Sequence, residues 1–262
     1  MPALITLLTD FGFEDEYVGV VKGVILSIHP SARLVDISHA VPPGDLVRAS
    51  WLLSWSWSCF PKGTVHLTVV DPGVGSSRKI LCLEKSGHLF LAPDNGILSR
   101  LLTKRDRFRC RAVTNRRYFL KNVSRTFHGR DIFAPVAAHL SKGVSPDRLG
   151  PRVDRFQTLP DLPVVGSPKG IKGQIILIDR FGNLVTNLPA EQVLSVAGKG
   201  KLEIRLKGKL LSGLQPSYSA VGRGRPLAVI GSHDLLEIAV NRGSAANRFG
   251  VKVGDPVQVR GV

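Results

Sequence analysis

Short apolar runs alternate with segments of helical spacing through the first 140 residues of this chain. A short apolar run predicts a buried strand, and apolar residues repeated every three or four positions predict a helix. The expected strands are 3–8, 34–37, 65–70, 80–83 and 89–91, and the expected helices are 17–28, 46–57, 95–102 and 132–140. Because strand and helix alternate, we expect an α/β/α domain built on a largely parallel sheet.

The pattern changes near residue 158. Residues 158–172 are rich in proline and glycine and are expected to form a linker. Beyond them, short strands are expected over 174–179, 201–205, 226–230, 235–240 and 256–259, with glycine-rich turns between them. Closely spaced strands of this kind are typical of a small β-barrel. We therefore expect an α/β domain over 1–157, a linker over 158–172 and a β-barrel domain over 173–262.

The composition argues against several classes of protein. A hydrophobic share of 43% is too high for a disordered chain, and three cysteines provide no disulfide framework. No apolar stretch is long enough for a membrane span, and the N-terminus lacks the basic segment and long apolar core of a signal peptide. We therefore expect a cytoplasmic protein.

The net charge of +16 raises the question of a polyanionic partner. Residues 167–262 carry 14 basic and 6 acidic side chains, so half of the excess lies there and half in the rest of the chain. The densest cluster consists of Lys104, Arg105, Arg107, Arg109, Arg111, Arg116 and Arg117. It is interpreted as a solvated surface, with a patch for RNA or another polyanion as the alternative. Nucleic acid is therefore not the expected partner.

Two aspartates come just after expected strands, Asp10 after 3–8 and Asp71 after 65–70. Ligands of open α/β sheets bind beyond the carboxyl ends of the strands, where a carboxylate can hold ribose hydroxyls, a metal ion or a water molecule. The alternative is an aspartate that caps a helix or closes a turn. His128 lies in a loop before an expected helix, where a structural role is the more frequent one. The sequence has no Walker loop, nucleophile elbow or compact zinc motif, so we expect no metal.

Six motifs occur in order along the chain and together resemble those of one family. They are 8–12 (LTDFG), 71–76 (DPGVGS) with Arg78, 92–96 (APDNG), 127–131 (FHGRD), 179–183 (DRFGN) and 231–241, which ends in EIAVN. The chain resembles the S-adenosyl-L-methionine (SAM) hydroxide adenosyltransferases, which are relatives of the SAM-dependent fluorinases and chlorinases. The resemblance covers nearly the whole chain. It implies an N-terminal α/β domain, a C-terminal β-barrel domain and a homotrimer, with SAM between the N-terminal domain of one subunit and the C-terminal domain of the next.

The resemblance also implies a reaction, in which hydroxide from water attacks the ribose C5′ of SAM and releases adenosine and L-methionine. It places the catalytic set at Asp71, Arg78 and His128. The sulfonium is already a good leaving group, so the enzyme must chiefly supply a nucleophile. A base that takes the proton of water contributes about 10²–10⁴-fold. We expect Arg78 and His128 to favour hydroxide and Asp71 to orient it.

The substrate-binding residues implied by the resemblance divide between the two expected domains. Asp10 in the first domain would hold the ribose hydroxyls. The second domain would supply Asp179 and Ser232 for the methionine amine and carboxylate, Asn183 and Asn241 on the adenine side, and Tyr218 as a ring that stacks on the purine. SAM is the substrate of this reaction, so no cofactor is implied.

Two positions depart from the family pattern. Gly44 stands where relatives carry an aromatic wall, and His233 stands where the halogenating relatives place an arginine. Against a halogenase, the Asp71 carboxylate repels halide, and Gly129 offers no hydroxyl to a fluoride ion. The alternatives to a SAM hydrolase are a basic nucleic-acid-binding protein, a SAM or adenosine sensor with little turnover, and a SAM-dependent halogenase.

Overall fold

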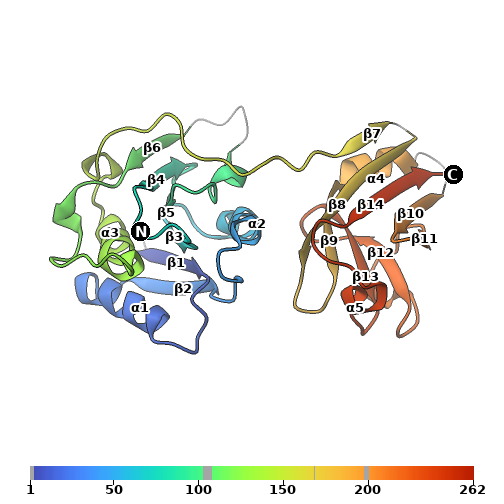
Figure 1. The fold of residues 1–262 in the computed structure, drawn as a ribbon, viewed down its shortest axis with the longest axis horizontal. Helices are drawn as coiled ribbons and strands as arrows, with labels where there is room; N and C mark the ends of the chain where they lie inside the picture. The colour runs from blue at the N-terminus through green and yellow to red at the C-terminus, as the bar shows by residue number, and fades with distance from the viewer. Residues whose placement is uncertain (1–2, 103–107, 168, 198–200) are drawn as a thin grey trace. The chain divides into compact units, whose positions relative to one another are not determined.

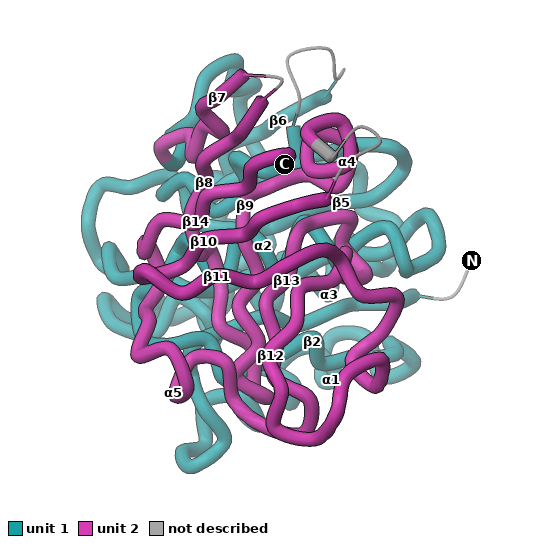
Figure 2. The backbone as a smooth tube through the Cα atoms, turned by 90° about the vertical axis from the view of Figure 1, so that its right-hand side faces the viewer, with its two compact units in different colours: residues 1–159 teal, residues 160–262 magenta. Residues whose placement is uncertain are grey.

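The computed structural model describes residues 3–102, 108–167, 169–197 and 201–262. The chain divides into two compact units, residues 1–159 (unit 1) and 160–262 (unit 2), which Figure 2 colours teal and magenta. Lys104, Arg105 and Arg107 of the basic cluster lie outside the described residues. Among the residues that are described, no helix is long and apolar enough to cross a membrane.

The described part of unit 1 contains a six-stranded sheet (Figure 1). The strands are β1 (Leu4–Thr9), β2 (Arg33–Ser38), β3 (Val65–Val69), β4 (Ile80–Lys85), β5 (His88–Pro93) and β6 (Arg109–Ala112). They lie in the order β2-β1-β3-β5-β4-β6. Strands β1, β2, β3 and β5 are parallel, and β4 is antiparallel to β5 and β6. The expected largely parallel sheet is confirmed.

Helices cover both faces of this sheet. Helices α1 (Tyr17–Ile28) and α3 (Ala134–Ser141) pack on one face, and α2 (Leu46–Ser56) packs on the other. Successive residues of a strand point to opposite faces, so Leu7 of β1 joins the core under α1 and α3 while Leu8 joins the core under α2. A strand buried on both faces has a continuous apolar sequence, which is why β1 could be predicted.

Two local expectations for unit 1 were wrong. The expected helix 95–102 is only a short 3-10 turn, Ser99–Leu101, because Gly96 adopts a φ of 94°, which an α-helix cannot include. Strand β6 was not expected, because its apolar positions are only Cys110 and Ala112, between two arginines. Both of these small side chains are buried, so the alternation is real but weak.

The described part of unit 2 is an antiparallel sheet that curls into a nearly closed barrel (Figure 1). Its strands are β7 (Val165–Ser167), β8 (Gly170–Ile178), β9 (Leu184–Pro189), β10 (Leu202–Leu206), β11 (Lys209–Ser212), β12 (Pro226–Ile230), β13 (Leu235–Val240) and β14 (Pro256–Gly261). The order is β11-β10-β14-β8-β9-β13-β12, and β7 pairs with β8. Helices α4 (Ala190–Ala197) and α5 (Ala245–Phe249) complete the unit. The expected β-barrel is confirmed.

Several elements of unit 2 were not expected. Residues 158–164 have no regular secondary structure, but the rest of the expected linker contains β7 and the start of β8, which pair as a hairpin. Strand β9 was missed because the polar Thr186 and Asn187 interrupt its apolar run, although both side chains are buried and hydrogen-bonded. Strand β11 follows β10 after the turn residues Lys207 and Gly208, both with positive φ. Such a turn suits the twist of a hairpin.

Candidate active site

Two aspartates lie at the carboxyl ends of adjacent parallel strands in unit 1. Asp10 follows β1 and Asp71 comes just after β3, and these strands pair with Thr9 opposite Val69. Asp10 Oδ2 accepts a hydrogen bond from the Gly44 N–H at 2.9 Å. Burial raises the pKa of Asp10; the Gly44 N–H opposes this shift, and the negative charge of Asp71 adds to it. The sheet topology therefore brings the two carboxylates to one edge.

Asp71, Arg78 and His128 form one hydrogen-bonded set. Arg78 Nε donates to Asp71 Oδ1 at 3.0 Å and to Oδ2 at 2.9 Å, and Arg78 Nη2 also donates to Oδ2. The same Nη2 atom lies 3.0 Å from His128 Nδ1. The side chains of Asp71 and Arg78 are only 5% and 9% exposed, so water and salt screen their charges weakly. The structure thus joins the three residues of the expected catalytic set.

His128 is a neutral acceptor in this set. A guanidinium can only donate, so His128 Nδ1 accepts from Arg78 and we assign the ring proton to Nε2. Burial lowers the pKa of His128, and the charge of Arg78 lowers it further, against the opposing effects of Asp71, Asp131 and the Ser124 carbonyl. His128 also directly precedes a π-helical turn, Gly129–Phe133. Such turns are frequent at functional sites.

Two glycines allow the loops of this set to approach closely. Gly75 has a φ of 80°, and a Cβ there would collide with the Arg125 carbonyl oxygen. This contact fixes the loop between β3 and β4, which carries Asp71, against the loop that carries His128. A Cβ at Gly129 would lie 3.2 Å from ring atoms of both Phe11 and Phe127. A side chain at Gly75 would therefore displace a loop of the set, and one at Gly129 would require the two rings to shift slightly.

An aromatic cluster lies beside His128, while Gly44 carries no side chain. Phe11, Tyr17 and Phe127 contact one another with ring centroids 5.0–6.0 Å apart, and Phe127 and Phe11 flank Gly129. Gly44 has a φ of 72°, where a bulky side chain would be strained. The ring cluster therefore supplies apolar surface beside His128 in unit 1.

In unit 2, Asp179 organises the tight turn after β8. Its Oδ1 accepts from the backbone N–H groups of Phe181 and Asn183 at 2.8 and 2.9 Å, and its Oδ2 accepts from Asn183 Nδ2 at 2.9 Å. Gly182 at the tip has a φ of 81° and packs against Ser244. These bonds fix the orientation of both the Asn183 amide and the Asp179 carboxylate.

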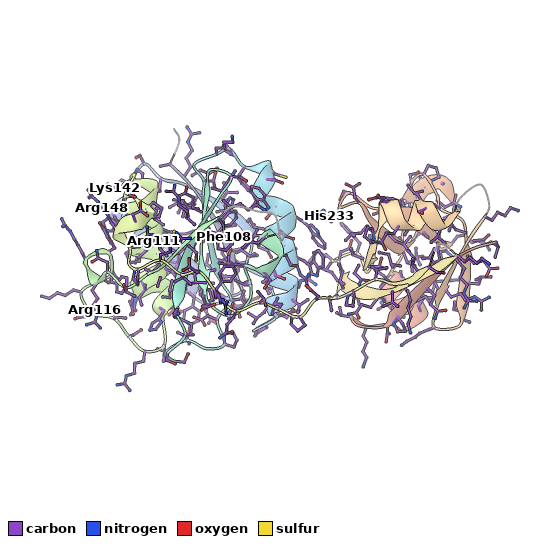
Figure 3. All side chains as sticks on the ribbon, turned by 90° about the horizontal axis from the view of Figure 1, so that it is seen from above. Phe108, Arg111, Arg116, Lys142, Arg148 and His233 are labelled. Atoms are coloured by element: carbon purple, nitrogen blue, oxygen red, sulfur yellow. The ribbon has the colours of Figure 1, made fainter. Side chains whose placement is uncertain are left out.

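A pocket of about 480 Å³ lies next to this turn. Its lining residues are Phe181, Asn183, Tyr218, Val240, Asn241, Arg242 and Gly243. Three of the expected adenine-side residues, Asn183, Tyr218 and Asn241, therefore share one pocket. Asn241 Nδ2 donates to the Val221 carbonyl at 2.7 Å, which holds the loop after β13. Ser232 is exposed in the turn between β12 and β13 and is not among the lining residues, and neither is its neighbour His233 (labelled in Figure 3).

Glu237 is a polar residue of this region that sequence reasoning missed. It is 8% exposed, and its Oε1 accepts from the Tyr218 hydroxyl at 2.5 Å. Burial raises the pKa of Glu237, the Tyr218 hydroxyl opposes the shift, and the charge of Asp179 adds to it. The available signal was a single carboxylate inside the apolar run 235–240, because such a group is rarely buried without a partner.

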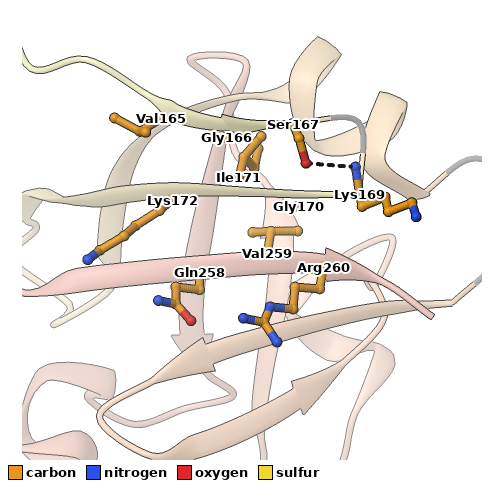
Figure 4. A pocket seen from close by; sticks show the side chains of 10 residues that line it. All are labelled: Val165, Gly166, Ser167, Lys169, Gly170, Ile171, Lys172, Gln258, Val259 and Arg260. Carbon is orange, nitrogen blue, oxygen red and sulfur yellow. Dashed lines mark hydrogen bonds between the residues drawn. The ribbon is translucent and has the colours of Figure 1, made fainter.

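A second pocket and the basic cluster contain none of the expected site residues. The second pocket, of about 450 Å³, lies along β7, β8 and β14 and includes Lys169, Lys172 and Arg260 (Figure 4). Its positive charge is unsuited to a sulfonium cation. In unit 1, Arg109 pairs with Glu84 and Arg111 with Asp147, while Arg116 is exposed (Figure 3). The described members of the basic cluster thus lie on a solvated surface. Among the described residues, no group of three His, Cys, Asp or Glu side chains could hold a metal ion.

Comparison with known proteins identifies the family. Two family models match, the SAM hydroxide adenosyltransferase N-terminal domain over residues 5–150 and C-terminal domain over residues 173–258. The chain is 39% identical to a Thermus thermophilus protein named (R)-S-adenosyl-L-methionine hydrolase, over 96% of this chain and 97% of the relative. A Nocardia brasiliensis protein named fluorinase is 26% identical over 98% of this chain and 96% of its own length. A solved structure of an uncharacterized conserved protein from Thermotoga maritima is 39% identical and matches with a TM-score of 0.91 over 98% of this chain and 99% of that chain. This chain therefore belongs to the SAM hydroxide adenosyltransferase family.

Proposed function

We propose that this protein hydrolyses SAM to adenosine and L-methionine. The observation that carries the proposal is the hydrogen-bonded set Asp71–Arg78–His128, in which the Asp71 and Arg78 side chains are buried and Asp71 follows the strand adjacent to the one before Asp10. The near full-length similarity to a protein named (R)-S-adenosyl-L-methionine hydrolase supports it. SAM is the substrate in this proposal, and the reaction needs no cofactor or metal. We also propose that the enzyme acts in the cytoplasm.

The proposed step is a displacement at C5′. A hydroxide oxygen derived from water forms the new bond to C5′ while the bond between C5′ and the sulfonium sulfur breaks. The sulfur keeps the electron pair and becomes the neutral thioether of methionine, and the proton lost by water passes to solvent. The enzyme must therefore hold a hydroxide-like oxygen in line with the breaking bond, because correct orientation supplies a large part of the rate.

The geometry supports a different role for each residue of the catalytic set. The Asp71 carboxylate retains lone pairs beyond those that Arg78 occupies, so it can orient the water. The buried Arg78 guanidinium stabilises the negative charge of hydroxide. His128 holds Arg78 in place instead of taking the proton itself, because its Nδ1 lone pair accepts from Arg78. Neutral His128 also adds no positive charge that would compete with Arg78.

The remaining contacts divide between the units. Asp10 in unit 1 would accept the two ribose hydroxyls. In unit 2, Tyr218, Asn183 and Asn241 would hold the purine in their shared pocket, while the methionine amine and carboxylate would be held by Asp179 and Ser232. The buried Glu237, beside Tyr218, adds negative charge near Asp179. These carboxylates explain how a chain of net charge +16 can bind a cationic substrate.

We further propose a homotrimer with the site at the subunit interface. Each unit by itself carries only part of the binding set, which supports this arrangement. Sedimentation equilibrium tests it, and a monomer at the concentrations used for catalysis would contradict it.

The decisive experiment follows the products. SAM is incubated with the protein in oxygen-18-labelled water, with and without chloride or fluoride, and the products are separated and weighed by mass spectrometry. We expect equal amounts of methionine and adenosine, with the label in the 5′ oxygen, whether or not halide is present. Asp71→Asn should retain SAM binding and turn over about 10²-fold more slowly, because the water loses the carboxylate that orients it. A 5′-halogenated adenosine would show a halogenase, and bound SAM without product would show a sensor.

A further inference from the structure

A buried polar chain leads from the surface of unit 1 to the loop that carries Asp10. Lys22 Nζ lies 2.6 Å from Asp36 Oδ2, and Asp36 Oδ1 lies 3.1 Å from His39 Nε2. On the other side of the imidazole, His39 Nδ1 lies 2.7 Å from Thr9 Oγ1. Thr9 and His39 are each 1% exposed. Buried polar groups are costly unless they are hydrogen-bonded, so the buried bond between Thr9 and His39 is a built feature of this unit.

The hydrogen-bond roles along this chain can be assigned. The Asp36 carboxylate beside Nε2 favours the ring proton there, so His39 Nδ1 accepts from the Thr9 hydroxyl. Burial opposes the charge on Asp36, but the nearby Lys22 and His39 outweigh it and hold the pKa of Asp36 below its usual value. The Thr9 oxygen in turn accepts from the Phe11 N–H at 3.2 Å. The His39 side chain thereby bonds to Thr9 on one side of Asp10, and through Thr9 it is linked to Phe11 on the other side.

The backbone of the same histidine makes a second contact with this loop. The His39 carbonyl accepts from the Gly12 N–H at 2.8 Å. Gly44, five residues beyond His39, donates its N–H to the Asp10 carboxylate. The segment after β2 therefore holds both the backbone around Asp10 and one of its carboxylate oxygens.

The arrangement of Asp36, His39 and Thr9 has the connectivity of a catalytic triad, but its burial assigns a different role. A nucleophile must reach its substrate, and the Thr9 hydroxyl is enclosed and donates to His39. Asp10 is the partly exposed residue to which the chain leads. The chain therefore acts on the geometry of Asp10.

We propose that His39 is a positioning residue that sets the Asp10 carboxylate for two hydrogen bonds with the ribose hydroxyls of the substrate. This inference rests on the proposed function, because it assigns Asp10 to the ribose. A displacement of about 1 Å can cost about 10²-fold in rate. Two hydroxyls can donate charge-assisted hydrogen bonds to one carboxylate only if the position and the rotation of that carboxylate are both correct.

The test compares the binding of adenosine with that of 2′,3′-dideoxyadenosine, which lacks both hydroxyls, by isothermal titration calorimetry. We expect the wild-type protein to prefer adenosine, and Asp10→Asn to reduce that preference by about 10–100-fold. His39→Ala should reduce the same preference by about tenfold, with little effect on the dideoxynucleoside. A general loss of structure would instead weaken both ligands equally.

Matched variants complete the design. His39→Asn places an acceptor near the position of Nδ1 and should restore most of the preference. Thr9→Val, which replaces the hydroxyl with a methyl group of similar size, should match His39→Ala. It tests the inference if His39→Ala does not fold. His29→Ala is the control, because His29 bonds to Ser141 at 2.8 Å and follows α1 in the same unit. It should leave the preference unchanged.

Two results would overturn the inference: an unchanged preference in both His39→Ala and Thr9→Val, or no preference in the wild-type protein. Failure of the proposed function is a separate outcome. It would appear as wild-type protein that prefers adenosine but forms no adenosine from SAM. The binding comparison would still report on His39 in that case.

Discussion

The ion pair between Asp71 and Arg78 supports a quantitative prediction for Asp71→Asn. The Asp71 side chain is 5% exposed and the Arg78 side chain 9%, and Arg78 donates to the carboxylate through both Nε and Nη2. The pair therefore resembles a buried salt bridge and not a surface one. Removal of one partner leaves an uncompensated charge, which costs about 3–5 kcal/mol, whereas a surface pair is worth about 0–1 kcal/mol. For a unit of this size, that loss lowers the melting temperature by roughly 6–20 °C.

The tryptophans make this prediction measurable in one unit. The protein has three tryptophans, Trp51, Trp55 and Trp57, and all lie in unit 1. Tryptophan fluorescence during urea unfolding therefore reports the free energy of unfolding of unit 1. The double variant Asp71→Asn/Arg78→Met removes the orphaned charge as well, so it should be more stable than the sum of the two single losses predicts, by about 0.5–3 kcal/mol. A loss below about 1 kcal/mol for Asp71→Asn, or simple additivity, would refute the reasoning.

Three further predictions concern the loops, pH and the purine pocket. Gly75→Ala should lower kcat at least about tenfold, because its Cβ collides with the Arg125 carbonyl oxygen. Gly19→Ala, which has open space around it in α1, should leave kcat unchanged and raise the free energy of unfolding by up to about 1 kcal/mol. Steady-state kinetics and urea unfolding test both variants, and a Gly75→Ala variant with the kcat of the wild type would contradict the role of Gly75. Burial and Arg78 lower the pKa of His128, so kcat should be flat above the ordinary value of about 6.5 and fall as pH drops through the lowered pKa. Between about 6.5 and the lowered pKa, His128 is protonated in the unfolded chain but not in the folded one, so the free energy of unfolding should also fall as pH drops through this window. A kcat that rises toward acid pH would exclude a neutral His128 as the acceptor from Arg78. Tyr218→Phe should keep adenosine affinity within about threefold, whereas Tyr218→Ala should weaken it by about 1–3 kcal/mol in calorimetry; equal losses would show that the hydroxyl, and not the ring, carries the contact.

The positions of the two aspartates in unit 1 could be predicted, because each one follows the end of a strand. The runs before Asp10 and Asp71 are largely apolar, and both strands are buried on their two faces, as is typical of central strands of a largely parallel sheet. Once two such strands are adjacent and parallel, their carboxyl ends must lie at the same edge. The sequence thus placed each aspartate at a strand end, and the adjacency of β1 and β3, which brings the two together, is a feature of the tertiary structure.

The contacts made by His39 and Glu237 could not be predicted in this way. His39 lies between a strand and a loop, and Glu237 lies within an apolar run, so local patterning marks neither as a partner of a site residue. Their roles depend on which side chains face them across the fold, Thr9 in one case and Tyr218 in the other. These partners are separated along the chain by 30 and 19 positions.

Hydrophobic patterning and turn residues are enough to predict the two architectures, the central strands of unit 1 and the residue types available for chemistry. Hydrophobic periodicity records which face of each element is buried, and that is local information. The packing of distant segments is what shares Arg78 between Asp71 and His128, makes His128 accept through Nδ1, and brings His39 into contact with the loop around Asp10. These facts depend on atomic distances between distant segments, which the packing of the strands and loops sets and no periodic pattern encodes.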